Sequence, residues 1–445
     1  MRENTELGTN GNFGLNAGMK RGEVLGANFN ISHRGNSFSV FAEYAYLQMR
    51  NVRLWNNGFY SRNQTVNFKS NTDRNEFSQS HQFRAGIEKT FHENTHMAAY
   101  FNLNRTDKTF VGEGISTLQA EDALILGDIW YRELRNNNNR GAHFHISHQL
   151  HAKHRFRMDY DWVYLQLDNP TTYDNTLQYN QDTTKFTIDL DSHTPMNFQV
   201  ASLAYQFQPA APLNIKAGVK KTWMNFENSL QSYRDLNGTR QFDPFFSNLA
   251  QIEENISAAY INGDWQISDY WQVKAGLRFE HTITDMRLIE EGKWDTIYRN
   301  YKNIFPNLML QKKLTEKATL ILGYSRRINR PSLNDLVPLI LLINQNTHFI
   351  GNPSLLPGLI DNYKLDFKYN RMSLSFEHSN TKNAIAPYQP RFDPEQELLI
   401  MSPENLRFLQ NTGLFSTRHG SYQPIGTCRP ISWFNKPVSK PPIWQ

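Results

Sequence analysis

Apolar and polar side chains alternate along much of this chain with a period of two residues. In the segment 155–164, one set of alternate positions carries Phe156, Met158, Tyr160, Trp162 and Tyr164, and the other carries Arg155, Arg157, Asp159 and Asp161. Successive side chains of a β-strand point to opposite faces of its sheet, so this pattern predicts a strand with one apolar and one charged face. The segments 37–46, 186–190, 271–279 and 363–369 repeat it.

Segment length separates a membrane barrel from a soluble β-sandwich, because both alternate in this way. Many of the alternating segments run about ten residues or more, whereas strands of globular proteins are most often five or six residues long. A tilted strand needs about nine to eleven residues to cross a bilayer. We count roughly sixteen candidate strands, fewer than the 22 of a complete outer-membrane transporter barrel.

The connections between these segments fall into two classes. Tight connections are expected at 34–36, 92–94, 151–153, 268–270 and 314–316, and long polar loops at 51–78, 105–140, 225–249, 285–302 and 329–360. The asparagine-rich tract 136–139 is expected to lie in an exposed loop. Short turns on the periplasmic side and long loops outside are typical of outer-membrane barrels. The loops 51–78 and 225–249 should therefore lie opposite the turns 268–270 and 314–316.

Composition agrees with a membrane barrel. Hydrophobic residues make up only 39% of the chain and the mean hydropathy is -0.63, yet aromatic residues reach 13%. Disordered chains are poor in aromatics, so the low hydropathy does not indicate disorder. A barrel accounts for both values, because half of each strand faces a polar lumen and aromatic girdles mark the two membrane interfaces. No apolar run reaches the ~18 residues of a membrane-spanning helix.

Several other classes of protein are disfavoured. The single cysteine, Cys428, excludes an intrachain disulfide and a multi-cysteine metal site. The net charge of +5 is made of cations interleaved with acids, and with no binding module present we expect no nucleic-acid partner. The N-terminus lacks the apolar core of a signal peptide, so an exported chain would be a mature form or a fragment of a longer gene.

Two dense motifs lie between residues 254 and 357. One is Tyr-Ser-Arg-Arg-Ile-Asn-Arg-Pro-Ser at 324–332, with Arg326, Arg327, Arg330 and Pro331, and the other is Gly-Asn-Pro-Ser-Leu-Leu-Pro at 351–357, with Gly351, Asn352 and Pro353. Together with Phe305-Pro306-Asn307 and the strand-like stretches before it, this series resembles the barrel of TonB-dependent outer-membrane receptors, in the branch common among Bacteroidetes. The resemblance covers most of residues 11–410. It implies an all-β, antiparallel, transmembrane β-barrel in the outer membrane of a Gram-negative bacterium.

The resemblance also implies a function and a set of partners. The chain would be the barrel part of a receptor that imports a bulky substrate, such as a metal chelate, a cobalamin-like compound, an oligosaccharide or a peptide. Outer-membrane lipid would surround it. In the family the arginine motif ends one strand and the Gly-Asn-Pro motif leads back to the next, so we expect Arg326, Arg327, Arg330, Pro331, Gly351, Asn352 and Pro353 to be structural residues of the lumen or rim. Prolines cannot donate ladder hydrogen bonds, which agrees with strand ends and loops.

Two parts of the family pattern are not recognisable in this sequence. The plug, with the box through which the TonB complex acts, is not found before the barrel pattern begins near residue 12. The closing strands are also expected to be missing, so the barrel would be incomplete. After about Gln410 alternation fades and prolines accumulate, and we divide the chain into a barrel domain, 1–410, and a tail, 411–445, that is frameshifted or disordered. Expressed alone, the chain should not act as an energy-coupled transporter.

Other candidate sites are weaker, and no catalytic residue, cofactor site or metal site is assigned. His143 and His145 would share a strand face while His148 opposes them, so these histidines do not converge on one metal ion. Trp130, Trp162, Trp223, Trp265 and Trp271 are expected in the interface girdles. An outer-membrane lipase or protease would need a catalytic motif, and none is present. The alternative to import is a structural or surface-binding barrel that transports nothing, or a non-functional gene fragment.

Overall fold

A computed structural model describes residues 7–19, 21–61, 66–120, 123–179, 182–236, 238–244, 246–290, 293–337, 340–344, 347–393 and 398–418. Nearly all of them belong to β-strands, and a single short helix, α1 (Leu333–Leu336), is present in this part of the chain. No helix within the described ranges is long and apolar enough to span a membrane.

The strands form one sheet, which confirms the expected all-β antiparallel fold. They are β1 (Gly8–Met19), β2 (Glu23–Arg34), β3 (Phe38–Ser61), β4 (Val66–Phe91), β5 (Thr95–Ala120), β6 (Ala123–His151), β7 (His154–Asp168), β8 (Thr171–Tyr179), β9 (Asp182–Ala210), β10 (Leu213–Leu236), β11 (Thr239–Phe242), β12 (Asn248–Gln266), β13 (Trp271–Glu290), β14 (Lys293–Lys313), β15 (Ala318–Asn329), β16 (Ile340–Asn344), β17 (Thr347–Ile350), β18 (Gly358–Tyr369), β19 (Met372–Asp393) and β20 (Leu398–Arg418).

Neighbouring strands of the wall are mostly joined as antiparallel hairpins in chain order. β7 and β8 both pair with β6 and with β9, so they form one interrupted strand. β15 pairs directly with β18, while the short β16–β17 hairpin between them leaves the wall and pairs in parallel with β20 through β17. With β7 and β8 counted once and β11, β16 and β17 set aside, the described wall has sixteen strands, close to the number expected from the alternation.

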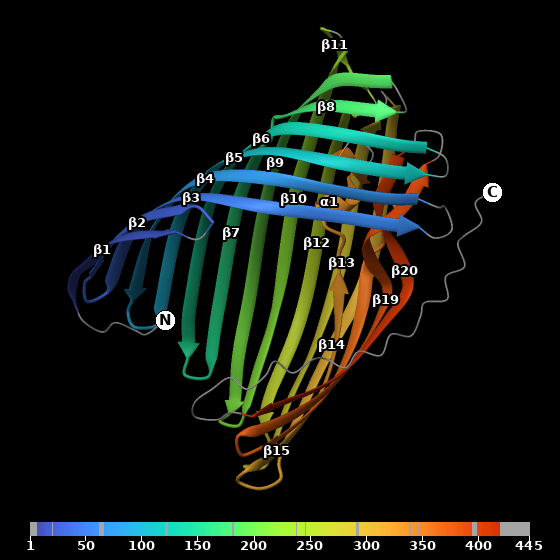
Figure 1. The fold of residues 1–445 in the computed structure, drawn as a ribbon. Coiled ribbons are helices and arrows are strands. Elements are labelled where there is room, and N and C mark those ends of the chain that lie inside the picture. The colour runs from blue at the N-terminus through green and yellow to red at the C-terminus, as the bar shows by residue number, and fades with distance from the viewer. Residues whose placement is uncertain are drawn as a thin grey trace.

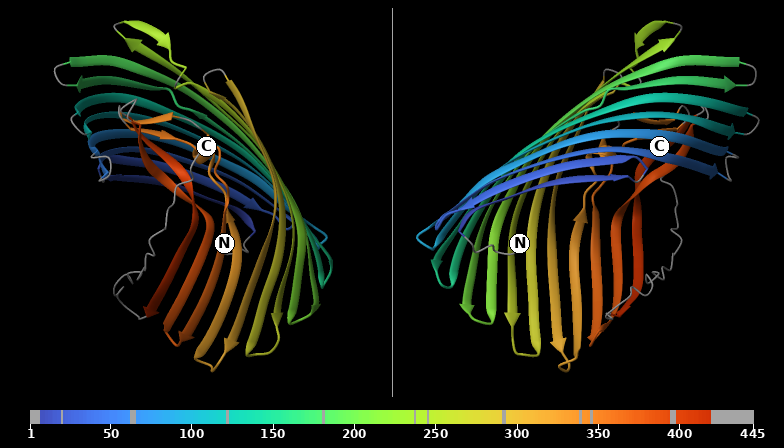
Figure 2. Two further views of the ribbon diagram at one scale, coloured as in Figure 1. Left: turned by 90° about the vertical axis from the view of Figure 1, so that its right-hand side faces the viewer. Right: turned by 60° about the vertical axis from the view of Figure 1, so that its left-hand side comes forward.

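The sheet is long, twisted and curved (Figure 1). Figure 2 shows it bending around α1, β16 and β17, with the blue N-terminal strands and the red C-terminal strands at its two ends. No pairing joins β1 to β20 among the described residues, so these two strands are the edges of the sheet.

The tight connections lie where they were expected, between β2 and β3, β4 and β5, β6 and β7, β12 and β13, and β14 and β15. All lie at one end of the sheet, which we call the short-turn end. Most of the expected long loops are wrong. The segments 51–78 and 105–140 are mainly continuous strand in β3–β6, and most of 225–249 and 285–302 lies in β10–β14. The asparagine tract 136–139 likewise lies within β6.

These polar stretches remain strands because the ladder continues past the apolar band of the sheet. β3 and β4 stay paired without a register shift from Phe38 to Ser61. Backbone hydrogen bonds of the ladder do not depend on side-chain polarity, so a strand that has left the membrane can be polar on its exposed face. Only the stretch 329–360 is largely irregular, as expected.

The two faces of the sheet exchange character along β12 and β13. Near the short-turn end, β12 and β13 expose Ile261, Leu277 and Phe279 on one face. Farther along, the buried apolar residues Ile252 and Met286 belong to the opposite face. We call the first face outer and the second inner, because α1 and its flanking residues pack on the second. Phe156, Met158, Tyr160, Trp162 and Tyr164 align in register with the exposed outer rows, as the alternation predicted.

The last strand extends farther than expected. β20 runs past Gln410 to Arg418, pairing Thr412, Leu414 and Ser416 with β19. Ladder pairing therefore continues where alternation in the sequence fades. The remainder of the expected tail, 419–445, lies outside the described residues.

Candidate functional site

The segment between β15 and β18, residues 330–357, folds back onto the inner face of the sheet. We call it the lumenal segment; its described residues are 330–337, 340–344 and 347–357. It begins where Pro331, which lacks a backbone N–H, follows the last pairs of β15 with β18. Both family motifs of the sequence lie at its ends, and residues of both contact the wall.

A buried ion pair anchors the start of the segment. The Arg330 guanidinium donates to Glu280 Oε2 of β13 at 2.7 Å and to Thr282 Oγ1 at 3.3 Å. Glu280 is only 7% exposed and also accepts from Arg278 Nε at 2.5 Å. A carboxylate that is taken out of water requires such partners. Glu280 therefore joins the wall to the arginine motif.

An apolar socket holds the middle of the segment. Leu336 and Val337 at the end of α1, together with Leu355, pack against side chains of three wall strands. These are Phe226 of β10, Ala250 and Ile252 of β12, and Met286 and Leu288 of β13. Leu355 is 1% exposed. Burying a side chain of this kind contributes about 1.5–3 kcal/mol relative to leaving it exposed, so the socket is a major part of the attachment.

Helix α1 is fixed by its own residues. Ser332 is the N-cap, and its hydroxyl accepts from the Asp335 N–H at 3.2 Å, while Asp335 Oδ2 accepts from the Ser332 N–H at 2.9 Å. This reciprocal capping box satisfies two backbone donors at the start of a helix that has a single turn.

The Gly-Asn-Pro motif closes the segment against α1 and β20. A Cβ at Gly351 would lie 1.9 Å from the Val337 carbonyl oxygen, so no larger residue fits without backbone movement. The Asn352 N–H donates to the Asp335 carbonyl at 2.6 Å, and Asn352 Nδ2 donates to the Pro403 carbonyl at 3.1 Å. The carbonyl of Pro353 accepts from the Arg299 guanidinium of β14.

The remaining arginines of the first motif do not join this site. Arg326 makes two hydrogen bonds to Asp361, at 2.7 and 2.9 Å, and Tyr324 donates to the same carboxylate at 2.7 Å. These three side chains share the outer face with the exposed Leu322 and Tyr363. Arg327 is exposed on the inner face and makes no ion pair within the described residues. Sequence reasoning treated the three arginines alike, but strand alternation separates them.

A second charged cluster lies on the inner face at the far end of β4–β6. The Arg74 guanidinium contacts Glu133 at 2.9 Å and lies 3.8 Å above the ring of Phe110, which is an electrostatically favourable position for a cation. Burial raises the pKa of Tyr131 and that of Tyr173 nearby, so both phenols remain neutral donors at ordinary pH. The inner wall thus carries fixed charges at more than one level.

The histidines occupy both faces, as alternation predicted. His143 and His145 lie on the inner face, where their Nδ1 atoms contact Asp161 at 2.5 Å and Asp159 at 2.7 Å, and His148 lies on the outer face beside Thr95. No group of three or more histidine, cysteine, aspartate or glutamate side chains within the described ranges is arranged to hold a metal ion.

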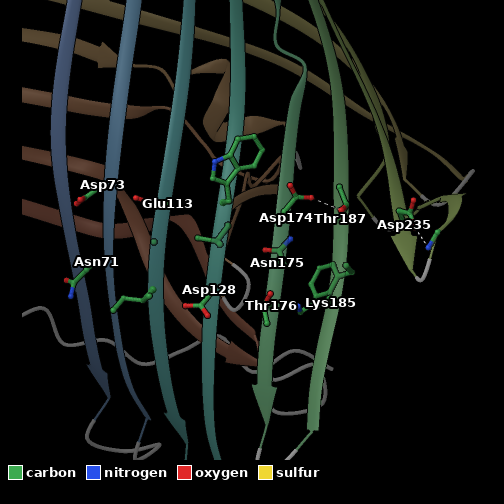
Figure 3. Close-up of a pocket in the computed structure, with 16 residues that line it drawn as sticks. Asn71, Asp73, Glu113, Asp128, Asp174, Asn175, Thr176, Lys185, Thr187 and Asp235 are labelled. Atoms are coloured by element: carbon green, nitrogen blue, oxygen red, sulfur yellow. Dashed lines mark hydrogen bonds between the residues drawn. The ribbon is translucent and has the colours of Figure 1, made fainter. Parts of the chain in front are cut away.

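A pocket of about 950 Å³ lies on the outer face of the far end, across β4, β5, β6, β8, β9 and β10. Figure 3 shows carboxylates from neighbouring strands along it. These are Asp73, Glu113, Asp128, Asp174 and Asp235, with Lys185 as the lysine of the lining. Such a lining favours cationic or hydroxyl-bearing groups over anions. Trp130 lines this pocket and is 40% exposed; its place in an interface girdle stays a prediction.

Several anchoring residues were not identified from the sequence. Alternation places Glu280 and Arg299 on the inner face, but it cannot name their partners, which lie about 50 residues away in the chain. Asn405 was also missed. Its side chain accepts from the Leu356 N–H at 2.7 Å and donates to the carbonyls of Leu356 and Asn383.

Comparison with known proteins agrees with the β-sheet architecture described above. A family model described as "Outer membrane protein beta-barrel family" matches residues 148–426. No curated protein sequence matches the chain.

Three solved structures illustrate the structural similarity. A mutant of the ferric enterobactin receptor PfeA from Pseudomonas aeruginosa has a TM-score of 0.54 at 12% identity, over 93% of this chain and 60% of that one. The siderophore receptor PiuA from Acinetobacter baumannii gives 0.53 at 11%, over 95% and 66%. The Serratia marcescens hemophore receptor HasR, in complex with its hemophore HasA and heme, gives 0.52 at 9%, over 92% and 61%. The chain thus spans less than two thirds of each of these receptors.

Proposed function

The chain belongs to the outer membrane protein beta-barrel family and resides in the outer membrane, and from this premise we propose that it is the barrel portion of a TonB-dependent receptor that imports a bulky substrate. The solved structures with a similar fold include receptors for siderophores and for a hemophore with heme. A metal chelate or another ligand too large for porins is the corresponding substrate class for this chain.

The observation that carries the proposal is the lumenal segment. A sheet of this size curves around a wide space, and wide transporter barrels restrict passage by filling their lumen. Here the segment is fixed to the inner face by the Arg330–Glu280 pair, the socket around Leu355 and the bond from Arg299 to Pro353. A barrel that served only as a surface scaffold would gain nothing from an ordered segment directed inward.

Within this function, the motif residues have structural roles. Arg330, Pro331, Gly351, Asn352 and Pro353 set the path of the lumenal segment, as their contacts with the wall and with α1 suggest. Arg326 fastens β15 to β18 from the outer side. Arg327 is free to meet solute on the inner side. We assign no catalytic role to any of them.

The partners follow from the same proposal. Lipid contacts the exposed apolar rows of the outer face. The TonB complex acts through a plug domain rather than through the wall strands, and the substrate enters from the far end of the sheet, past the lumenal segment.

Uptake by cells of the native source tests this function. Cells in which this chain is deleted should lose energy-dependent uptake of one member of a panel of ferric siderophores, heme, cobalamin and oligosaccharides. Restoring the gene in its native context should restore uptake, and a protonophore should abolish it. If the deletion changes surface binding of a panel member while every uptake rate stays unchanged, the chain is a surface-binding barrel and the import proposal is wrong.

A further inference from the structure

A second concave site lies on the outer face, within the apolar rows that contact lipid. It is a groove of about 530 Å³ across β7, β9, β10, β12 and β13. Leu203, Val219 and Phe279 line it, and all three are exposed. Ala201 and Ala259 line it as well, and their small side chains leave the hollow between larger neighbours. Asp159 and Lys220 border the groove, but in the alternation of their strands both side chains belong to the inner face.

The end of the groove away from the short turns carries a cation. Lys221 lies one outer-face position beyond Val219, donates to Ser257 Oγ at 2.9 Å and lies 5.9 Å from the ring of Trp223. Ser257 is opposite Lys221 in the ladder and also lines the groove.

More basic side chains continue this level of the sheet. His281 is opposite Ser257, and Lys302 is opposite His281, all on the outer face. The next described outer-face residues on these strands are Val219, Trp223, Asn255, Ala259, Phe279, Ile283, Asn300 and Ile304, none of which is a carboxylate. The row formed by Lys221, Ser257, His281 and Lys302 therefore carries basic side chains, and no acidic side chain lies next to it on the outer face of these strands. The apolar rows of the outer face end one step beyond this level, with Trp223 and Ile283.

We propose that this groove binds a phosphate-bearing membrane lipid of the outer leaflet. An acyl chain lies in the apolar hollow over Ala201 and Ala259, and the phosphate meets Lys221, with His281 and Lys302 beside it. Charge complementarity selects an anionic headgroup, and the apolar lining selects an acyl chain. The orientation is consistent, because short turns face the periplasm and the basic end of the groove then lies at the outer-leaflet interface.

Lipid binding to the full 445-residue chain in detergent tests this site. Native mass spectrometry should show tighter binding of dioleoylphosphatidylglycerol than of dioleoylphosphatidylcholine. Lys221→Gln should weaken phosphatidylglycerol binding about fivefold, because one lysine near an anionic lipid surface contributes about that factor. Lys221→Arg should retain the preference. Ala259→Trp fills the hollow and should weaken both lipids, and Ala201→Trp is the second filling variant if the first does not fold.

Lys312 provides the matched control. It also lies on the outer face against a tryptophan, 4.7 Å from the ring of Trp271, but near the short turns and away from the groove. Lys312→Gln should leave the preference for phosphatidylglycerol unchanged. Equal losses in Lys221→Gln and Lys312→Gln would mean that the lysines only reach the interface as general surface charge. That result, equal affinity of the native chain for both lipids, or unchanged binding in both filling variants would overturn the proposal.

Discussion

At the scale of single residues, the attachment of the lumenal segment depends on a few contacts. Glu280 should be the least tolerant of substitution, because it is buried and accepts hydrogen bonds from two arginines. Removing one partner of a buried ion pair leaves a charge without compensation, which costs more than the pair contributes when intact. Gly351 should also tolerate no larger residue, because the neighbouring group is the backbone carbonyl of Val337, which cannot rotate away as a side chain could.

Replacing Gly351 should loosen the segment. Gly351→Ala places a methyl group against the Val337 carbonyl, and overpacking of this kind costs about 1–3 kcal/mol. We expect faster proteolysis of residues 330–357 in the folded protein and a lower temperature for loss of heat-modifiable gel migration. Gly263→Ala in β12 is the control, since a Cβ there meets no atom within 4 Å. If both variants behave alike, the close approach at Gly351 has no energetic consequence.

Replacing Glu280 should have a larger effect than breaking an exposed pair. Glu280→Gln removes the negative charge that pairs with Arg278 and Arg330 and turns one acceptor oxygen into a donor, and it should destabilise the fold by about 3–5 kcal/mol, measured by urea unfolding in lipid vesicles. A double-mutant cycle with Arg330→Gln should reveal the coupling. Asp264→Asn removes the exposed partner of Lys274 and should cost less than about 1 kcal/mol. If the effects of Glu280→Gln and Arg330→Gln on the free energy of unfolding are additive, the two side chains are not coupled and do not anchor the segment together.

At the scale of elements, β12 and β13 each consist of two amphipathic parts in opposite phase. In β13 the exposed apolar residues Leu277 and Phe279 occupy odd positions, and the buried apolar residues Met286 and Leu288 occupy even ones. The first part contacts lipid on the outer face. The second part meets water outside and the lumenal segment inside. We therefore expect the change of phase to mark where these strands leave the membrane.

An arginine scan of β12 should reveal the lipid-facing part. Ile261 is 52% exposed on the outer face within the apolar rows, and an arginine there should cost about 2–4 kcal/mol near the bilayer midplane. Asn262→Arg, on the adjacent inner position, should be tolerated. Equilibrium folding into phospholipid vesicles measures both. A greater cost for Asn262→Arg than for Ile261→Arg would reverse the two faces.

At the scale of the whole molecule, the two ends of the sheet differ. The five tight turns expected from the sequence lie at one end, and the strands β3–β6 and β9–β14 extend far beyond the apolar rows at the other. Connections at the far end are also short, as between β13 and β14, so the extended strands are what distinguish the two ends. Short turns belong to the periplasmic side of outer-membrane barrels and extended structure to the cell surface. The lumenal segment contacts the inner face near that far end, so we expect it to lie toward the outside of the cell.

Cysteine labelling in intact cells should show this direction. In a background in which Cys428 is replaced by Ser, Thr239→Cys in the exposed strand β11 should react with a membrane-impermeant maleimide. Asn94→Cys in the turn between β4 and β5 should react only after the outer membrane is permeabilised. Labelling of Asn94→Cys alone in intact cells would invert the orientation, and with it the leaflet assigned to the lipid groove.

The sequence alone determined the all-β class, the positions of the tight turns and the face on which each strand residue lies, because these follow from a period of two and from turn chemistry within a few residues. It misjudged the polar stretches 51–78 and 105–140, since side-chain polarity does not report whether a backbone ladder continues. Only the tertiary structure decided that Arg330 meets Glu280 while Arg326 meets Asp361. It also decided that Gly351 is confined by Val337 and that Lys221 stands at the end of an apolar groove. Such pairings depend on the register and curvature of strands far apart in the chain, and no local pattern encodes them.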